Sequence, residues 1–522
     1  MSSTEALFAR YGPSYRWMAT GTALVASIAV ILSATIVNVA IPDVMGAFGI
    51  DQTKAQWLST GFLAAMTATM LLTDWAARAL GQRGTITAAL LAFTAGSLLG
   101  GIAPNEDVLI AARVIQGAAA GVVQPMAMVT MFQVFPPERR GAAMGIYGIG
   151  VVLAPALGPW VGGLLMDSFN WRYVFYLGVP FAALGLALAN MFLPTRADTG
   201  PRPRFDWIGL GLMSVFLPAL LTAFSSGQRA GWESDTVLGE FAVAAVALTG
   251  FLWWERHTAK PLLDLRVFSQ GAFSAAALVS FVLGAGLFGT TYLLPIFVQT
   301  IQGMTPTQAG LLLMPGGFAL ALLFPIAGRL SDHLAPGILI ATGLVVFAYS
   351  SYLTSYADVH TGFWLLAWWV VLSRVGLGLV FPALNAGSLR VLAPEFLAQG
   401  SGAINFTRQL GGAFGVNLLA VALERRTMFH ADALAATQTP DNAATLALLA
   451  QVAGLTKSAG LPDFQQLPAA AWFLGQSVYL QASTLAYRDG FLITAIVFAA
   501  ALVPTWFLER YRRRMQRGEA RN

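Results

Sequence analysis

The amino-acid sequence predicts an all-α integral membrane protein with fourteen membrane-spanning helices, grouped as two six-helix bundles with two extra central helices. Composition is the first observation behind this prediction. Of the 522 residues, 57% are hydrophobic and 11% are charged, whereas a soluble domain carries roughly 25% charged residues. The second observation is a series of apolar runs, each near the roughly 20 residues that a membrane helix needs. The 53 glycines also suit helices that pack closely in lipid.

The apolar runs, taken in order, predict the fourteen spans. They lie near residues 17–40, 54–75, 84–102, 107–131, 141–166, 172–193, 206–225, 236–254, 270–298, 307–328, 336–356, 362–392, 400–422 and 490–508. The first run is too long for the core of a signal peptide and no small-residue cleavage site follows it, so we expect it to be retained. We divide the chain into an N-terminal six-helix bundle (1–200), two inserted helices, spans 7 and 8 (201–266), and a C-terminal six-helix bundle (267–522).

Basic residues predict the orientation. Of the 30 lysines and arginines, 20 fall on the side of the chain termini, 7 fall on the opposite side, and 3 lie within spans. The excess of basic residues in cytoplasmic loops therefore predicts that both termini are cytoplasmic. The net charge of +5 is an orientation signal, and we expect no nucleic-acid partner.

One segment interrupts the pattern of short loops. Residues 424–489 form a long polar and alanine-rich stretch on the outer side, before the last span. Parts of it, such as DNAATLALLAQVAGL, have the composition of short helices. The segment is interpreted as a tolerated surface insertion or as a docking surface for another protein, and the sequence leaves both open.

A weak internal repeat supports two equivalent halves. The loop LTDWAARALGQRG after span 2 corresponds to GRLSDHLAPG after span 10, and R-V-I-Q-G at Arg113 corresponds to R-V-G-L-G at Arg374. Glycine-rich spans follow each copy. Two six-helix units around one central cavity are typical of a secondary transporter that binds its substrate near the middle of the membrane.

These residues resemble the major facilitator superfamily, and within it the fourteen-span drug:proton antiporters of the EmrB/QacA type. The resemblance is carried by ATIVNVAIP (34–42), RVIQGAAAG (113–121), GIGVVLAPALGPWVGG (148–163), WRYVFYLGVP (171–180), DWIGL (206–210), YLLPIFVQTIQGMTPTQAGLLLMP (292–315) and GSGAINFTRQLGGAFG (400–415). The ending QASTLAYRDGF (481–491), after a long outer loop, is similar to the EmrB/FarB branch. The resemblance implies the superfamily's fold, multidrug efflux, a periplasmic membrane-fusion adaptor and an outer-membrane channel as partners, and no cofactor besides the proton gradient.

Arg113 is the first candidate for coupling. An arginine stays charged at any relevant pH, so it cannot itself carry the proton, but it can lower the pKa of a nearby acid or hold a network that responds to that acid. Gln116 lies on the same helical face and joins this network in our prediction. The alternative is a structural arginine bound by backbone carbonyls. For Arg374 and Arg408, placed at the substrate cavity, structural anchoring is the stronger interpretation.

The resemblance assigns shape-forming residues to span 5 and latch residues to two gate loops. The span-5 motif consists of Gly148, Pro155, Gly158, Pro159, Gly162 and Gly163; it implies a packed, moving contact between the halves, with a static kinked helix as the alternative. The gate motif G-x-L-x-D is present at Gly328 and Asp332. The loop after span 2, which ends near Gly81, departs from this motif. Asp74 occupies the position of the motif's glycine, and Arg78 occupies the position of its aspartate. Because they are four residues apart, these two can form an ion pair.

The first span departs from the family pattern L-D-x-T, because the chain has Ser33 in place of the aspartate. Ser33 cannot carry a proton, so Asp74, or an acid group on the substrate, is the candidate carrier. Thr35, Asn38 and Gln124 offer hydrogen bonds in the predicted cavity. A cavity without a central acid is poorly suited to dications, so we predict export of hydrophobic, neutral or weakly acidic amphiphiles by proton antiport.

Three other functions compete with drug export. A dedicated exporter or importer of one metabolite, lipid or siderophore shares the same fold, and a non-transporting sensor would tolerate the loss of Arg113. An enzyme would need a nucleophile or a metal set. The four histidines are scattered and no HExxH, P-loop or G-x-S-x-G motif occurs, so we expect no catalytic residue and no metal site.

Overall fold

The computed structural model describes residues 3–50, 52–196 and 203–519. Within these residues every regular element is a helix and none is a strand, which confirms the predicted all-α class. Eleven of the helices are long and apolar enough to cross a membrane. Three more long helices, α3, α6 and α15, lie in the same bundle. Each of the fourteen predicted spans corresponds mainly to one helix, except that spans 6 and 14 each fall on two consecutive helices.

The first helices of the chain pack on one another. They are α2 (Tyr15–Phe48), α3 (Gln52–Met70), α4 (Thr73–Gly101), α5 (Glu106–Val134), α6 (Arg140–Ser168), α7 (Tyr173–Tyr176) and α8 (Gly178–Phe192). Helix α5 lies between α3 and α4, and α2 packs on α5, α6 and α8. A side chain on Gly117 or Gly121 would collide with the carbonyl oxygens of Phe62 and Met66 on α3. The two helices approach each other closely at these glycines.

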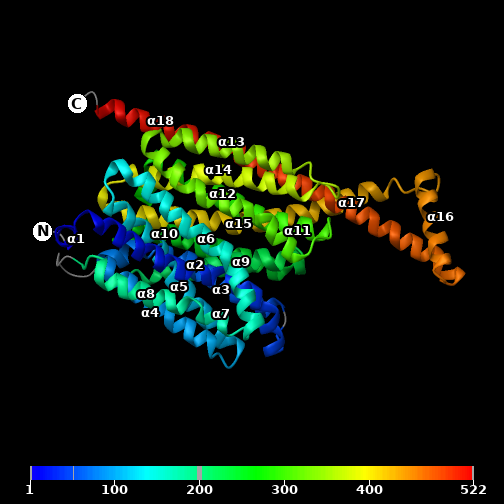
Figure 1. Ribbon diagram of the computed structural model, residues 1–522, viewed down its shortest axis with the longest axis horizontal. Coiled ribbons are helices and arrows are strands. Elements are labelled where there is room, and N and C mark those ends of the chain that lie inside the picture. The colour runs from blue at the N-terminus through cyan, green and yellow to red at the C-terminus, as the bar shows by residue number, and fades with distance from the viewer. Residues whose placement is uncertain (1–2, 51, 197–202, 520–522) are drawn as a thin grey trace.

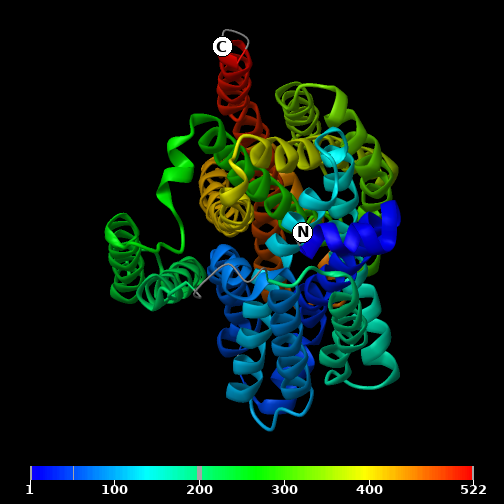
Figure 2. The same ribbon diagram turned by 90° about the vertical axis from the view of Figure 1, so that its left-hand side faces the viewer.

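A second group of helices forms the later half of the bundle. It consists of α11 (Gly271–Thr300), α12 (Pro306–His333), α13 (Pro336–Thr354), α14 (Phe363–Arg390), α15 (Leu397–Ala435), α17 (Asp463–Ala500) and α18 (Leu502–Glu519). Helix α11 packs along α15, where Gly284 meets the carbonyl of Arg408 and Gly411 meets that of Phe281. Helices α9 (Trp207–Ala230) and α10 (Asp235–His257) pack mainly on each other, and α9 also packs on α3. Figure 2 shows this pair at the left of the molecule.

The two ends of the bundle differ, and we name them by what they carry. The terminal end holds α1 (Ser3–Tyr11) and α18, and the hairpin end holds α16 (Ala443–Ser458), far from both termini (Figure 1). Short 3-10 helices join the longer elements at Gly12–Ser14, Pro137–Arg139, Leu265–Ser269 and Pro394–Phe396. The predicted boundary at 200/201 falls among residues 197–202, outside the described residues, and the division into three parts stays a prediction.

The long outer loop predicted over 424–489 is wrong in its boundaries. Helix α15 continues to Ala435 and α17 begins at Asp463, so most of the segment extends two bundle helices beyond the rest of the molecule, with α16 between them. The alanine-rich composition favours continuous helix. The predicted short helix in DNAATLALLAQVAGL is present as α16. Together, the end of α15, helix α16 and the start of α17 form a projecting hairpin.

The two halves meet mainly through α6 and α12. A side chain on Gly145 would collide with the Phe324 carbonyl, and one on Gly328 would lie 2.6 Å from the Gly141 carbonyl. Gly148 faces the Phe324 ring, which would lie 3.2 Å from a Cβ atom on this glycine. Small residues thus let the two helix backbones touch near the terminal end.

Gly81 breaks α4 into two helical pieces. Its φ of 73° and ψ of 173° are not helical, and a side chain there would come within 2.6 Å of the Arg196 backbone nitrogen. Only glycine adopts this conformation without strain. The break places the first piece of α4, with Asp74 and Arg78, across the terminal end of the bundle.

We predict that Gly81→Ala destabilises the protein, because the new methyl group collides with the backbone near Arg196 and because φ is positive. Such strain costs about 1–3 kcal/mol, so the apparent melting temperature of the purified protein should fall. Gly317→Ala is the control, since no atom lies within 4 Å of its Cβ position. An equal effect of the two substitutions would contradict the assignment of Gly81 as a required break.

Candidate functional site

Arg113 lies in the centre of the first half, with no solvent exposure. Its Nε donates to the Leu58 carbonyl on α3 at 2.9 Å, and its Nη1 donates to the carbonyl and the hydroxyl of Ser33 on α2 at 3.1 and 3.2 Å. Nη1 also donates to Gln116 Oε1 at 2.9 Å. Backbone carbonyls are a common partner of an intramembrane cation, so the predicted network of Arg113 and Gln116 is present.

Two partners of this network were not predicted from the sequence. The guanidinium lies 4.1 Å from the centre of the Phe62 ring, and such a cation–π contact is worth about 2 kcal/mol when desolvated. Gln116 Nε2 donates to the Ser97 hydroxyl on α4 at 2.8 Å. Arg113 therefore joins four helices, α2 to α5, and no sequence spacing connects Phe62 or Ser97 to it.

Arg113 has no carboxylate partner among the described residues. Ser33, which replaces the family's aspartate, offers its carbonyl and hydroxyl oxygens in place of a charge. One guanidinium nitrogen, Nη2, is buried without a hydrogen-bond partner. The site is thus structurally anchored and carries an uncompensated positive charge.

Arg374 and Arg408 are also buried, with 9% and 5% exposure. Arg374 Nη2 donates to Thr291 on α11 at 3.3 Å. Arg408 donates to Asn405 one turn earlier and lies 5.0 Å from the Phe381 ring centre. Neither has a carboxylate partner in the described part of the chain. The R-x-x-x-G copies at Arg113 and Arg374 are therefore alike in sequence but differ in their contacts.

Asn405 links Arg408 to the other half. Its amide donates to the Ser401 carbonyl at 2.9 Å and faces Met128 Sδ on α5 at 3.5 Å. Ser401 itself donates to the Pro125 carbonyl at 3.0 Å. Arg408 thus lies beside a contact between the halves, a position that its sequence neighbours did not indicate.

The other predicted cavity residues have separate surroundings. The Thr35 hydroxyl bonds to its own helix and meets Gly158, and Ile36 meets Gly162. Gln124 is buried and accepts a bond from Tyr147 through its main-chain oxygen. The structure describes the helix backbone at Asn38, Pro155, Pro159 and Gly163 but not the surroundings of these four residues. Helix α6 therefore contacts α2 through Gly158 and Gly162, and it contacts α12 through glycines nearer its start. The predicted motion of α6 between the halves stays a prediction.

Asp332 connects the two halves at the terminal end. Its Oδ1 and Oδ2 accept the backbone N–H groups of Gly141 and Ala142, the first turn of α6, at 2.6 and 2.9 Å. Arg390 donates to the same carboxylate at 2.8 Å. A helix N-terminus favours a carboxylate through its unpaired N–H groups and its dipole. We call Asp332, Arg390, Gly141 and Ala142 the latch; Arg390 was counted only as an orientation charge from the sequence.

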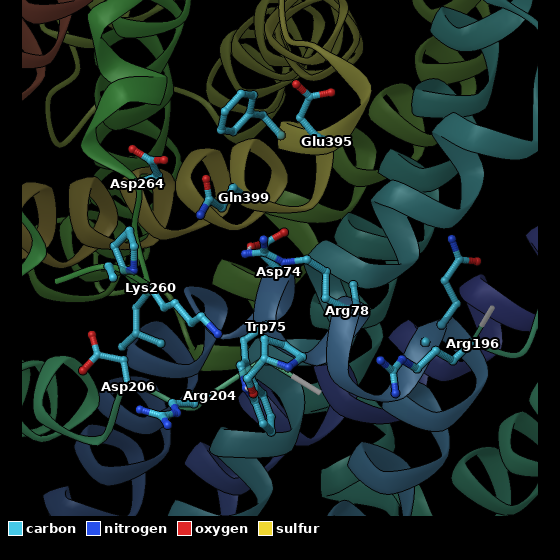
Figure 3. A pocket seen from close by; sticks show the side chains of 18 of the residues that line it. Asp74, Trp75, Arg78, Arg196, Arg204, Asp206, Lys260, Asp264, Glu395 and Gln399 are labelled. Atoms are coloured by element: carbon cyan, nitrogen blue, oxygen red, sulfur yellow. Dashed lines mark hydrogen bonds and ion pairs between the residues drawn. The ribbon is translucent and has the colours of Figure 1, made fainter. Parts of the chain in front are cut away.

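The predicted pair of Asp74 and Arg78 is present, as an ion pair on the first piece of α4. It lines a cavity of about 770 Å³ at the terminal end, with residues from 194–196 and 203–206, the loop 258–266 and Gln399 (Figure 3). The Arg266 guanidinium, hydrogen-bonded to Asp264 at 2.6 Å, holds the pKa of that carboxyl below its ordinary value. Basic and acidic groups alternate around this cavity, so it has no single sign of charge.

The described residues contain no group of three or more His, Asp or Glu side chains arranged to hold a metal ion. The buried polar groups that line the bundle instead bond to backbone and to each other.

Comparison with known proteins places these features in a family. The sequence profile of the Major Facilitator Superfamily matches residues 23–416. The chain is 29% identical to the multidrug export protein EmrB of Escherichia coli, over 91% of this chain and 92% of that protein. It is also 29% identical to the fatty acid resistance protein FarB of Neisseria gonorrhoeae, with the same two coverages. These relatives confirm the resemblance to the EmrB/FarB branch.

A solved structure with a similar fold is that of the human organic anion transporter TETRAN. It is 14% identical in sequence, with a TM-score of 0.60, and the match covers 92% of this chain and 99% of that one. At this identity the likeness concerns the fold alone, and it agrees with the arrangement of helices described above.

We predict that Asp332→Asn opens the latch. Charge-assisted hydrogen bonds are worth about 1.5–3 kcal/mol each, and 1.4 kcal/mol is a factor of ten in an equilibrium. Because the chain has no cysteine, Ser331→Cys introduces a single thiol at a buried position next to Asp332 of the latch. Maleimide labelling of this thiol should be about tenfold faster or more with Asp332→Asn.

Asp358→Asn is the matched control for the latch. Asp358 is an exposed acid at the hairpin end, bonded to Thr361 in its own turn. Its substitution should leave the labelling rate of Ser331→Cys unchanged. Equal labelling rates with Asp332→Asn and Asp358→Asn would show that Asp332 does not hold the halves together.

Proposed function

The chain belongs to the Major Facilitator Superfamily, and on this premise we propose that it exports hydrophobic, neutral or weakly acidic amphiphiles in exchange for protons. Its family makes it a multi-pass membrane transporter of small molecules and not an enzyme. Its relatives include proteins named for multidrug export and for fatty acid resistance. The substrate class, the proton coupling, the direction and the partners are the parts that we propose.

The observation that carries the substrate class is the set of three buried arginines without carboxylate partners in the described residues: Arg113, Arg374 and Arg408. In a medium of low polarity, uncompensated positive charges attract an anion and repel a dication. The acid group of a fatty-acid-like or phenolic compound would supply the missing negative charge. The apolar helix faces around it suit the hydrocarbon part.

Proton coupling has two candidate carriers. Asp74 is 3% exposed and paired with Arg78 at the terminal end, on a different helix piece from the Arg113 network. The acid group of a substrate is the other, and it would meet Arg113 directly. Either way the proton gradient is the energy source in this proposal, and no cofactor takes part.

We place the terminal end in the cytoplasm of a bacterial inner membrane. Five basic side chains line the cavity there: Arg78, Arg196, Arg204, Lys260 and Arg266. Basic residues favour the cytoplasmic side of a membrane protein. With this orientation, the closed latch blocks the cytoplasmic end, and the projecting hairpin lies in the periplasm.

The hairpin supports a tripartite assembly with a periplasmic adaptor and an outer-membrane channel. It extends beyond the bundle (Figure 1) and exposes large apolar side chains, with Phe464, Leu467 and Trp472 at 75%, 63% and 67%. Apolar groups exposed together mark an interaction surface. An adaptor that covers them would connect the pump to the outer membrane.

We predict that Arg113→Ala abolishes export, because the substrate's acid group loses its charged partner. In a pump-deficient Gram-negative host, wild-type protein should raise resistance to fatty acids and phenolic weak acids, and Arg113→Ala should not. Protein abundance in the membrane is measured alongside, since Arg113 also joins four helices. Arg113→Lys keeps the charge with fewer bonds and should retain partial activity.

Arg425→Ala, at an exposed arginine of the hairpin end, is the control in everted vesicles, where ΔpH-driven accumulation of a labelled fatty acid is followed. It should transport like wild type. A clear preference of the wild-type protein for permanent dications would overturn the substrate class, and accumulation driven in the opposite sense would indicate an importer.

We predict that Phe464→Ser, Leu467→Ser and Trp472→Ser, combined, separate the pump from its assembly. Vesicle transport should stay at the wild-type rate, because these residues lie outside the bundle, while resistance of whole cells should fall. Gln465→Ser, on the same exposed helix segment, should change neither. Full resistance in cells with the triple variant would argue that the hairpin is only a tolerated insertion.

A further inference from the structure

The motif D-W-I-G-L at 206–210 starts α9, and the proposed function does not use it. Asp206 Oδ1 accepts the Gly209 backbone N–H at 2.9 Å, as the helix cap, and the Trp254 indole N–H at 2.9 Å. The other oxygen, Oδ2, is buried without a hydrogen-bond partner. Asp206 is 8% exposed, so one half of its carboxylate is bound and the other half is left without a donor.

Glu255, in the last turn of α10, also has one bound and one unpartnered carboxylate oxygen. Its Oε2 accepts the Leu263 backbone N–H at 3.2 Å. Its Oε1 is buried without a hydrogen-bond partner, and the residue is 4% exposed. An ionised carboxylate buried in this way costs several kcal/mol unless it is paired.

Both unpartnered oxygens lie next to Gly209. A Cβ placed on Gly209 would be 2.5 Å from Asp206 Oδ2 and 2.7 Å from Glu255 Oε1, so the oxygens are no farther apart than the sum of these distances. Glycine at 209 leaves open the space next to both oxygens, which a side chain would fill. This geometry accounts for the D-x-x-G spacing, which helix capping by Asp206 alone does not require.

The charged groups around the pair do not neutralise it. The nearest is a third acid, Asp264 on the loop 258–266, and its carboxylate is bound to Arg266 at 2.6 Å. From α10, Arg256 and His257 are exposed, as are Arg204 and Lys260 from the flanking segments. Asp74 and Arg78, across the cavity, are bound to each other. No described cation donates to Asp206 or Glu255.

Two ionised carboxylates cannot share a buried site without a positive charge between them, and a single shared proton removes the repulsion. We propose that Asp206 and Glu255 form a proton-binding site that holds one proton between Oδ2 and Oε1. A calcium ion takes six to eight oxygen ligands, and the described residues offer no group of three or more acidic or histidine side chains that could hold a metal ion. The proton satisfies both oxygens with one hydrogen bond.

The site fastens three segments to one another: the start of α9, the end of α10 and the loop 258–264, through the Leu263 N–H. Asp206 and Asp264 line the same cavity as the Asp74–Arg78 pair (Figure 3). Release of the proton would loosen this loop beside the gate. That consequence for transport rests on the proposed export, whereas the binding of the proton does not.

Infrared difference spectroscopy of the purified full-length protein tests the site. A protonated buried carboxyl gives a carbonyl stretching band that shifts in D₂O. We expect this band at neutral pH in wild type, and its loss in both Asp206→Asn and Glu255→Gln, because either amide donates to the remaining carboxylate. Asp264→Asn, at the neighbouring acid bound to Arg266, is the control and should keep the band.

Retention of the band in Asp206→Asn or in Glu255→Gln would overturn a shared proton, and so would its absence from wild type. Thermal unfolding gives a second measurement that does not depend on transport. Because the native state holds a proton that unfolded carboxyls release, the melting temperature of wild type should fall as pH rises, and Glu255→Gln should lose this dependence. Stabilisation of wild type by sodium or calcium ions, without the band, would indicate a cation instead.

Discussion

A charge buried among apolar helices must find hydrogen-bond acceptors within the protein, and the structure around Arg113 follows from that requirement. Water cannot solvate the guanidinium at this depth, so carbonyls of α2 and α3, the Gln116 amide and the Phe62 ring surround it. These partners come from three different helices. The residue that is most costly to bury thereby fixes how the first half of the bundle packs.

The same requirement explains the glycines next to it. Arg113 reaches the Leu58 carbonyl only because α5 approaches α3 closely, and Gly117 and Gly121 permit that approach. The halves are joined on the same principle, since the first-turn N–H groups of α6 need an acceptor and Asp332 supplies one from α12. Backbone groups of one half are thus bound by side-chain groups of the other.

Several buried polar atoms of the described residues have no hydrogen-bond partner, and two of these places carry the proposals made above. Arg113 keeps an unpartnered Nη2, which suits an acidic solute, and Asp206 and Glu255 each keep an unpartnered oxygen, which suits a proton. The first lies inside the bundle and the second beside the gate cavity at the terminal end. A transporter that exchanges an acid for a proton would need sites of both kinds.

The sequence alone determined the all-α membrane class, the order of the spans, the family, the buried arginines and the Asp74–Arg78 pair, because each depends on composition or on spacing within one helix. Tertiary structure decided what those residues touch. Phe62 and Leu58 meet Arg113 from another helix, and Ser97 meets its partner Gln116. Arg390 meets Asp332 across 58 positions of chain, and Asp206 and Glu255 both come close to Gly209. It also turned the predicted loop 424–489 into a helical hairpin. The physical reason is that the periodicity of one helix predicts which face is polar, whereas the partner of that face depends on how separate helices pack.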